Sequence, residues 1–102
     1  MIFHIALPGD WAAAQAAGAY TVSTRGKTLA EEGFIHAGDD MEQVEFVRSM
    51  AYNDVEDLVL LVIDESKLDV PVKREAVPDA GRTFPHIYGA LPLAAVVEVR
   101  PL

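Results

Sequence analysis

Hydrophobic and polar residues alternate at the start of the chain in a pattern typical of a β-strand. Over residues 2–7, one face carries Phe3, Ile5 and Leu7, and His4 points to the opposite face. The alternation therefore predicts a strand, and it places this histidine outside the core.

Two helices are predicted between the strands. Residues 11–17 are rich in alanine, with Asp10 in position to cap their start and Gly18 to end them in a left-handed conformation. Residues 41–52 carry apolar side chains at spacings of three and four, and Asp40 precedes them as a capping residue. The pattern predicts a short helix near the N-terminus and a longer amphipathic helix in the middle of the chain.

The other predicted elements are strands. They cover residues 20–23, 33–36, 58–63, 72–77, 84–88 and 94–99. Residues 58–63 form a continuous apolar run that is too short for an average helix, so we predict a central strand buried on both faces. Pro71 pushes the strand after it toward a sheet edge, and residues 78–83 form a polar loop. The order of elements predicts a single α+β domain over residues 1–102.

Composition and charge exclude several classes of function. The chain has 102 residues, enough for one core, and a formal net charge of −8. Since such a charge repels phosphate backbones and anionic lipids, we expect no binding to bulk nucleic acid or membranes. Cysteine is absent, which excludes disulfides, thiolate metal ligands and a cysteine nucleophile. No apolar run approaches the ~18 residues of a membrane span, and we expect a cytoplasmic protein.

The candidate chemistry lies in three histidines, all of which fall in predicted strands. His36 closes an apolar strand just before an acidic helix start, a position where ligands meet helix N-termini. His4 and His86 lie in strands of the same kind, so the three imidazoles can converge. Phe84 and Tyr88 share a strand face with His86 and can stack on a flat ring. The pattern predicts a histidine-lined site with an aromatic wall.

Several segments together resemble an uncharacterised bacterial family known as domain of unknown function 952. They are Gly33-Phe34-Ile35-His36, residues 58–64, Glu75 and Phe84-Pro85-His86-Ile87-Tyr88-Gly89. The resemblance covers nearly the whole chain and is most specific in the last block. This family is usually grouped with the ADP-ribosyltransferase-like superfamily, and the layout here is similar to its RNA 2'-phosphotransferase branch. The residues that carry this second similarity are His4, Trp11, Gly18 and His36.

The resemblance implies a small split antiparallel sheet of about six strands with two helices, around a cleft for NAD or an ADP-ribosylated molecule. In such folds His4 would contact a ribose hydroxyl, and His36 would lie beside the nicotinamide or the reacting ribose. Glu75 would orient the nucleophile. Candidates for phosphate contacts are Arg25, Arg74 and Arg82.

The leading expectation is an ADP-ribosyl or NAD-type transferase or hydrolase that acts on a small nucleotide-like ligand. Its candidate catalytic residues are His36, Glu75 and His86. Its candidate cofactor-binding residues are His4, Arg25, Phe84 and Tyr88. We expect NAD as the possible cofactor, no metal, and a monomer or weak homodimer.

Three other functions stay open on the sequence. One is a non-catalytic nucleotide or metabolite binding module of the same fold, which is favoured because Ile5-Ala6 stands where the phosphotransferase branch has Gly-Thr. Another is a metal site built from the three histidines, although their spacings match no local metal motif. The last is a purely structural or partner-binding domain.

Overall fold

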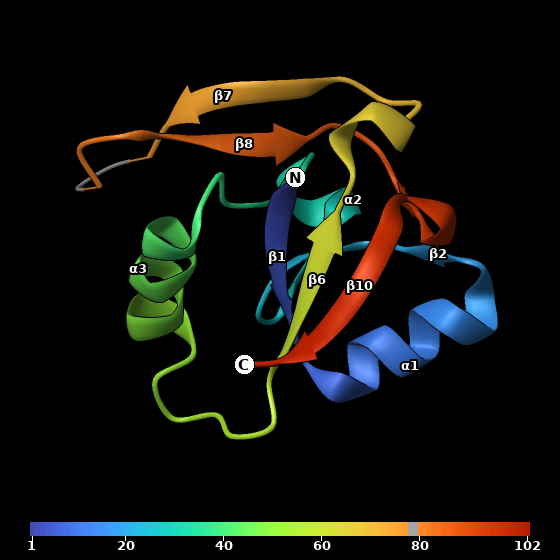
Figure 1. Ribbon diagram of the computed structural model, residues 1–102, viewed down its shortest axis with the longest axis horizontal. Helices are drawn as coiled ribbons and strands as arrows, with labels where there is room; N and C mark the ends of the chain where they lie inside the picture. The colour runs from blue at the N-terminus through green and yellow to red at the C-terminus, as the bar shows by residue number, and fades with distance from the viewer. Residues whose placement is uncertain (78–79) are drawn as a thin grey trace.

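Two three-stranded antiparallel sheets form the framework of the domain (Figure 1). The computed structural model describes residues 1–77 and 80–102. The first sheet has the order β1-β6-β10, with bounds Ile2–Ala6, Val59–Ile63 and Val96–Pro101. Strand β6 pairs antiparallel with both of its neighbours. The central strand predicted over residues 58–63 is confirmed.

The second sheet lies across the top of the first in Figure 1. Its order is β5-β8-β7, with bounds Ile35–His36, Thr83–Ile87 and Val72–Ala76. Strand β7 is at the edge, as Pro71 indicated. A backbone bridge joins the sheets: the amide of Phe3 donates to the carbonyl of Gly38 at 2.8 Å, and the amide of Gly38 donates back at 2.7 Å. The bridge holds the end of β5 against β1.

Short pairings and turns complete the sheet structure. Strand β2 (Ala19–Tyr20) pairs with β9 (Leu91–Pro92), and β3 (Val22–Thr24) pairs with β4 (Lys27–Thr28). Two 3-10 helices, η1 (Glu65–Lys67) and η2 (Leu93–Ala95), follow β6 and β9. The β3-β4 hairpin turns at Gly26, whose φ of 74° favours glycine.

The α-helices of the described residues are α1 (Pro8–Ala17), α2 (Leu29–Glu32) and α3 (Met41–Ala51). Helix α1 begins earlier than predicted because Pro8 occupies its first turn, where a missing amide hydrogen costs nothing. The residue before the helix is Leu7, so the predicted cap at Asp10 is wrong. Gly18 ends α1 with a φ of 91°, as predicted. Within the described residues, no helix is both long and apolar enough to cross a membrane.

The structure confirms a mixed fold of helices and antiparallel sheets, but with more elements than expected. Against the predicted six or so strands and two helices, residues 1–77 and 80–102 contain ten strand segments and three α-helices. The additional segments have two to four residues, too few for a periodic pattern. Of the loop predicted over residues 78–83, residues 78–79 lie outside the described part of the chain.

Both faces of the first sheet are covered, and this buries a histidine expected outside the core. One face packs Ile2 and Leu61 beneath α1, and the other packs Ile5 and Leu60 against α3. His4 shares the first face and is 3% exposed. The predicted exposure of His4 is therefore wrong, because alternation identifies the two faces of a strand but not what covers each of them.

Candidate functional site

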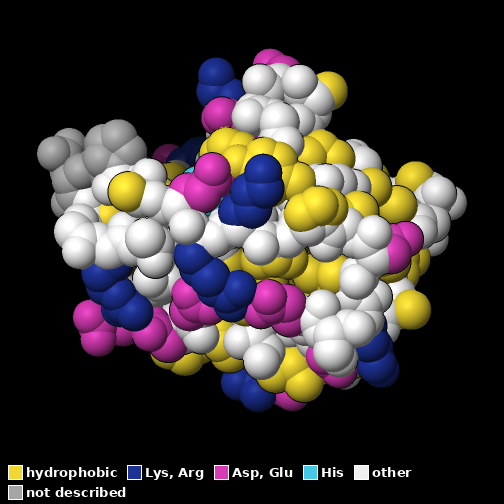
Figure 2. Space-filling view, turned by 90° about the horizontal axis from the view of Figure 1, so that it is seen from above, with side chains coloured by type: hydrophobic (Ala, Val, Ile, Leu, Met, Phe, Trp, Pro, Cys, Tyr) yellow, Lys and Arg dark blue, Asp and Glu magenta, His cyan; other side chains and the backbone are white. Residues whose placement is uncertain are grey.

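An open cleft lies beside the second sheet. Its volume is about 390 Å³, within the range of small-ligand sites. The residues that line it are Thr24, Glu32, Phe34, His36, Glu75, Ala76, Val77, His86 and Tyr88. Figure 2 views the molecule from above this sheet, and hydrophobic side chains gather across the middle of that face with acidic and basic side chains among them.

The strand register explains why these side chains meet. His36 of β5 pairs directly with His86 of β8, and Glu75 of β7 pairs with Phe84, two residues before His86. Side chains that are opposite or two residues apart across antiparallel strands share one face of the sheet. One face of the second sheet therefore gathers two imidazoles, a carboxylate and a phenyl ring.

Glu75 is the centre of a hydrogen-bonded cluster in the cleft. Its Oε1 atom accepts from Nδ1 of His86 at 2.8 Å and from the hydroxyl of Tyr88. The bond from Tyr88, followed by the bond from His86, lowers the pKa of the Glu75 carboxyl. The side chain is 40% exposed, so an ionised carboxylate is open to a ligand. The hydrogen bond between Tyr88 and Glu75 also raises the pKa of the Tyr88 hydroxyl.

The hydrogen bond to Glu75 fixes the orientation of the His86 ring. Because an ionised carboxylate only accepts, Nδ1 of His86 carries a proton. Its Nε2 atom is buried and has no hydrogen-bond partner among the described residues. Because Nε2 is buried, His86 contributes to the cleft by holding Glu75 through Nδ1.

Aromatic rings form one wall of the cleft. Phe34 stacks on the ring of His86, with centroids 3.9 Å apart and planes 10° from parallel, and it lies 5.7 Å from the ring of Tyr88. Lys73 places its Nζ atom 4.9 Å from the centroid of the Tyr88 ring. Such faces attract flat rings and cations. Phe34 was not predicted as a site residue, although its place two residues before His36 puts it on the same strand face.

His36 lies between the cleft and helix α3. Its ring is 5.2 Å from Phe84 and 5.4 Å from His86, measured between centroids. Burial, followed by the charges of His86 and His4, lowers the pKa of His36 from 6.5 to about 4. His36 is therefore neutral at pH 7, and can act as a hydrogen-bonding group without adding positive charge.

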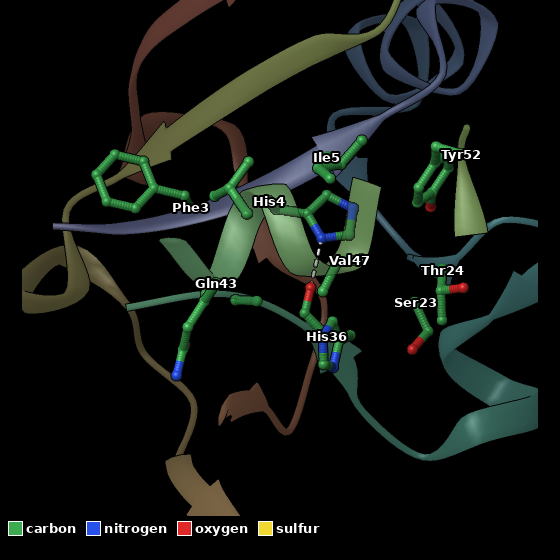
Figure 3. Close-up of a pocket in the computed structure, with 12 residues that line it drawn as sticks. Phe3, His4, Ile5, Ser23, Thr24, His36, Gln43, Val47 and Tyr52 are labelled. Carbon is green, nitrogen blue, oxygen red and sulfur yellow. Dashed lines mark hydrogen bonds between the residues drawn. The ribbon is translucent and has the colours of Figure 1, made fainter. Parts of the chain in front are cut away.

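His4 supports the site from inside the protein. Its Nδ1 atom donates to the carbonyl of His36 at 2.6 Å (Figure 3). Its Nε2 atom accepts from the hydroxyl of Tyr20 at 2.8 Å. Burial lowers the pKa of His4 to about 4, so the ring is neutral. Both ring nitrogens are used within the protein, and His4 does not line the cleft. A ribose contact from His4, as the resemblance implied, would require these bonds to break.

The arginines proposed as phosphate contacts are all engaged elsewhere. The ion-pair partners are Asp54 for Arg25, Asp39 and Glu65 for Arg74, and Asp40 and Glu42 for Arg82. None of the three lines the cleft, and no lysine or arginine of the described residues does so. Arg25 follows Thr24, which does line the cleft, but its guanidinium is held by the end of α3.

The structure thus brings together part of the predicted site. His36, Glu75, His86 and Tyr88 line one cleft, whereas His4 lies beneath it and Arg25 beside it. Phe84 lies under His36 and lines a neighbouring hollow. Residues 1–77 and 80–102 contain no group of three or more histidine, aspartate or glutamate side chains arranged to hold a metal ion. The geometry does not favour the three-histidine metal site.

The fold and the cleft define a small α+β domain with a carboxylate, imidazole and phenol cluster beside an aromatic wall. The family model described as "Protein of unknown function (DUF952)" matches residues 5–99, and the chain belongs to this family, as the sequence motifs predicted. Crystal structures of protein CC0527 from Caulobacter crescentus and of its double mutant are 31% and 30% identical to the chain. Each match covers 99% of this chain and 84% of that one, with a TM-score of 0.83. No curated protein matches the chain.

Proposed function

We propose that the cleft binds a nucleotide-like ligand and acts on the bond between a ribose and a nitrogen heterocycle, as an ADP-ribosyl or NAD-type hydrolase or transferase. The observation that carries this proposal is the Glu75 carboxylate, ionised and fixed by His86 and Tyr88 in an open aromatic cleft. The sequence similarity to the ADP-ribosyltransferase-like superfamily supports the same chemistry.

The charges in the cleft suit a ligand that carries or develops positive charge. Glu75 is negative, the aromatic faces of Phe34 and Tyr88 attract cations, and His36 is neutral. A pyridinium riboside such as the nicotinamide end of NAD is a flat cation, and its ribose carbon becomes cationic as the ring leaves. Preorganised negative charge stabilises such a transition state.

The reaction needs no nucleophile from the protein. The bond between C1′ of the ribose and the ring nitrogen breaks, its electron pair stays on the nitrogen, and the cationic ring leaves as a neutral base. A water oxygen, or an acceptor oxygen, then bonds to C1′ and loses a proton. Oε2 of Glu75 has no hydrogen-bond partner among the described residues, so it can orient a ribose hydroxyl or take that proton.

A second candidate is a binding module without catalysis. It is favoured by the position of the histidines: both nitrogens of His4 are used within the protein, and Nε2 of His86 is buried. On this alternative the cluster recognises a ligand through Glu75 and the aromatic wall but transfers no proton.

Nicotinamide release tests the proposal. The purified protein is incubated with millimolar NAD or nicotinamide riboside, and free nicotinamide is measured by chromatography. We expect release by the wild type and a loss of about 100-fold in Glu75→Gln, because the carboxylate charge is removed with little change in shape. Glu56→Gln is the matched control, since Glu56 is exposed and lies outside the cleft.

Ligand-induced stabilisation separates the two candidates. Binding to the folded state raises the melting temperature by mass action. A thermal shift without nicotinamide release would support the binding module and remove the catalytic claim for these substrates. If NAD and nicotinamide riboside cause no thermal shift and no nicotinamide is released, both candidates are contradicted for pyridinium ribosides.

A further inference from the structure

A second hollow adjoins the cleft on the side of helix α3. Its volume is about 210 Å³. The residues that line it are Thr24, His36, Phe46, Val47, Met50, Val77 and Phe84. Thr24, His36 and Val77 also line the cleft, so the two spaces meet, and the imidazole of His36 lies at their junction.

The second hollow differs from the cleft in its chemistry. Phe84 contributes a ring that lies 5.2 Å from His36 and 5.8 Å from Phe46 between centroids, and Met50 adds a thioether side chain that is 70% exposed. Among the described residues, no charged side chain lines this space. Aromatic edges and methionine sulfur pack well against flat rings.

We infer that the two spaces form one bipartite site in which the second hollow holds an uncharged flat ring, such as a purine base. This inference rests on the proposed function for the identity of the cleft ligand. The ribosyl group lies beside Glu75, and the neutral imidazole of His36 lies where the two parts of the ligand join. An exposed methionine at the rim keeps the hollow adaptable to rings of different outline.

The lining also selects against phosphate. The charged side chains that line the two spaces are Glu32 and Glu75, and no lysine or arginine of the described residues joins them. The nearby Arg25 is already paired with Asp54. A phosphate in the site would lie near two carboxylates, and Lys73, whose Nζ atom is 4.9 Å from the centroid of the Tyr88 ring, lines neither space, so the site is unfavourable for phosphate. The ligand class that fits both spaces is therefore nucleoside-like, and among the substrates proposed for the cleft this favours a nucleoside over NAD, whose pyrophosphate would lie in the site.

Titration of the isotope-labelled full chain with adenosine tests this inference by NMR. We expect adenosine to shift the backbone signals of Phe46 and Phe84. Substitution of Met50 by Gln should weaken binding roughly three- to tenfold, because an apolar contact of the ring is lost. Met41→Gln is the matched control, since Met41 is an exposed methionine of the same helix outside the hollow. Adenosine 5′-monophosphate should bind several-fold more weakly than adenosine.

The outcomes separate this inference from the proposed function. Equal affinity of Met50→Gln and Met41→Gln for adenosine, or tighter binding of the monophosphate, overturns the second subsite. Nicotinamide release from nicotinamide riboside is measured in the same preparations. If either of these binding results is found together with nicotinamide release, the proposed function stands and the second subsite is rejected. Conversely, adenosine binding that depends on Met50, without any release, supports the subsite and overturns the catalysis.

Discussion

Acidification should destabilise the protein through its buried histidines. Burial lowers the pKa of His4 from 6.5 to about 4, opposed in part by the hydrogen bond to the carbonyl of His36. The unfolded chain takes up a proton near pH 6.5, whereas folded His4 stays neutral until about pH 4. The stability that neutral His4 contributes is thus complete above pH 6.5 and is lost as the pH falls from 6.5 to 4.

The size of the effect follows from the width of this window. At pH 5 the medium is about 1.5 units below the unfolded pKa, and each unit corresponds to about 1.4 kcal/mol, so His4 accounts for a loss of about 2 kcal/mol. His36, whose pKa is also lowered to about 4, adds a contribution of the same sign. A domain of this size has a total stability on the order of 5–15 kcal/mol, so the loss is readily measured.

Denaturant unfolding at pH 7 and pH 5 provides the assay. The variant His4→Asn keeps an N–H donor for the carbonyl of His36 but does not titrate. Its free energy of unfolding should be lower than that of the wild type at pH 7. Between pH 7 and pH 5, however, that free energy should fall by about 2 kcal/mol less than in the wild type. Groups that titrate independently of His4 act in both proteins and cancel in the comparison. Asn53→His, which adds a histidine at an exposed position, should leave the wild-type loss unchanged.

Equal pH-dependent losses in the wild type and in His4→Asn would refute this reasoning. That result would mean that the folded protein protonates His4 as readily as the unfolded chain does. The hydrogen bonds of the ring to His36 and Tyr20, which require one N–H and one acceptor nitrogen, would then not describe the folded state near pH 5.

Two further predictions concern packing and buried polar groups. Gly89→Ala should destabilise the fold by about 1–3 kcal/mol, because the added Cβ would lie 2.4 Å from Cγ1 of Val70. Thermal unfolding measures the effect. Gly9→Ala is the control, since a Cβ at Gly9 meets no atom within 4 Å. Gln43→Met should cost about 1–3 kcal/mol in denaturant unfolding, because buried Gln43 donates to the carbonyl of Thr83 at 2.8 Å. An unchanged free energy of unfolding in Gln43→Met would contradict this and show that the hydrogen bond to Thr83 contributes no net stability.

The sequence predicted the parts of the fold that local patterns encode. The apolar run over residues 58–63 identified the central strand, and Pro71 identified an edge, because both depend on local chemistry. Asp40 was expected to cap α3, and its side chain does accept from the amide of Gln43 at 2.9 Å. The single turn of α2 was missed because four residues carry no period, although Thr28 and Glu31 form a capping box.

The candidate site was only partly predictable, since it depends on pairings between distant segments. His36 and His86 are fifty residues apart in the sequence and meet through the register of β5 with β8. Glu75 was singled out from its strand and from the resemblance, but its bonds to His86 and Tyr88 depend on the three-strand arrangement. The engagement of Arg25 by Asp54 has no sequence signal, because it depends on where the β3-β4 turn meets the end of α3.

The buried position of His4 indicates a supporting role in place of the ligand contact that its position on the first strand implied. A histidine on the first strand can serve a cleft by touching the ligand or by fixing the residues that do. Here Tyr20 donates to His4, and His4 donates to the backbone carbonyl of His36, so this chain of bonds positions the junction residue of the cleft from inside the core. Burial keeps both imidazoles neutral at pH 7, and the charged side chains that line the cleft are Glu32 and Glu75. The position of His36, where the cleft and the second hollow meet, therefore depends on a residue that does not line the cleft.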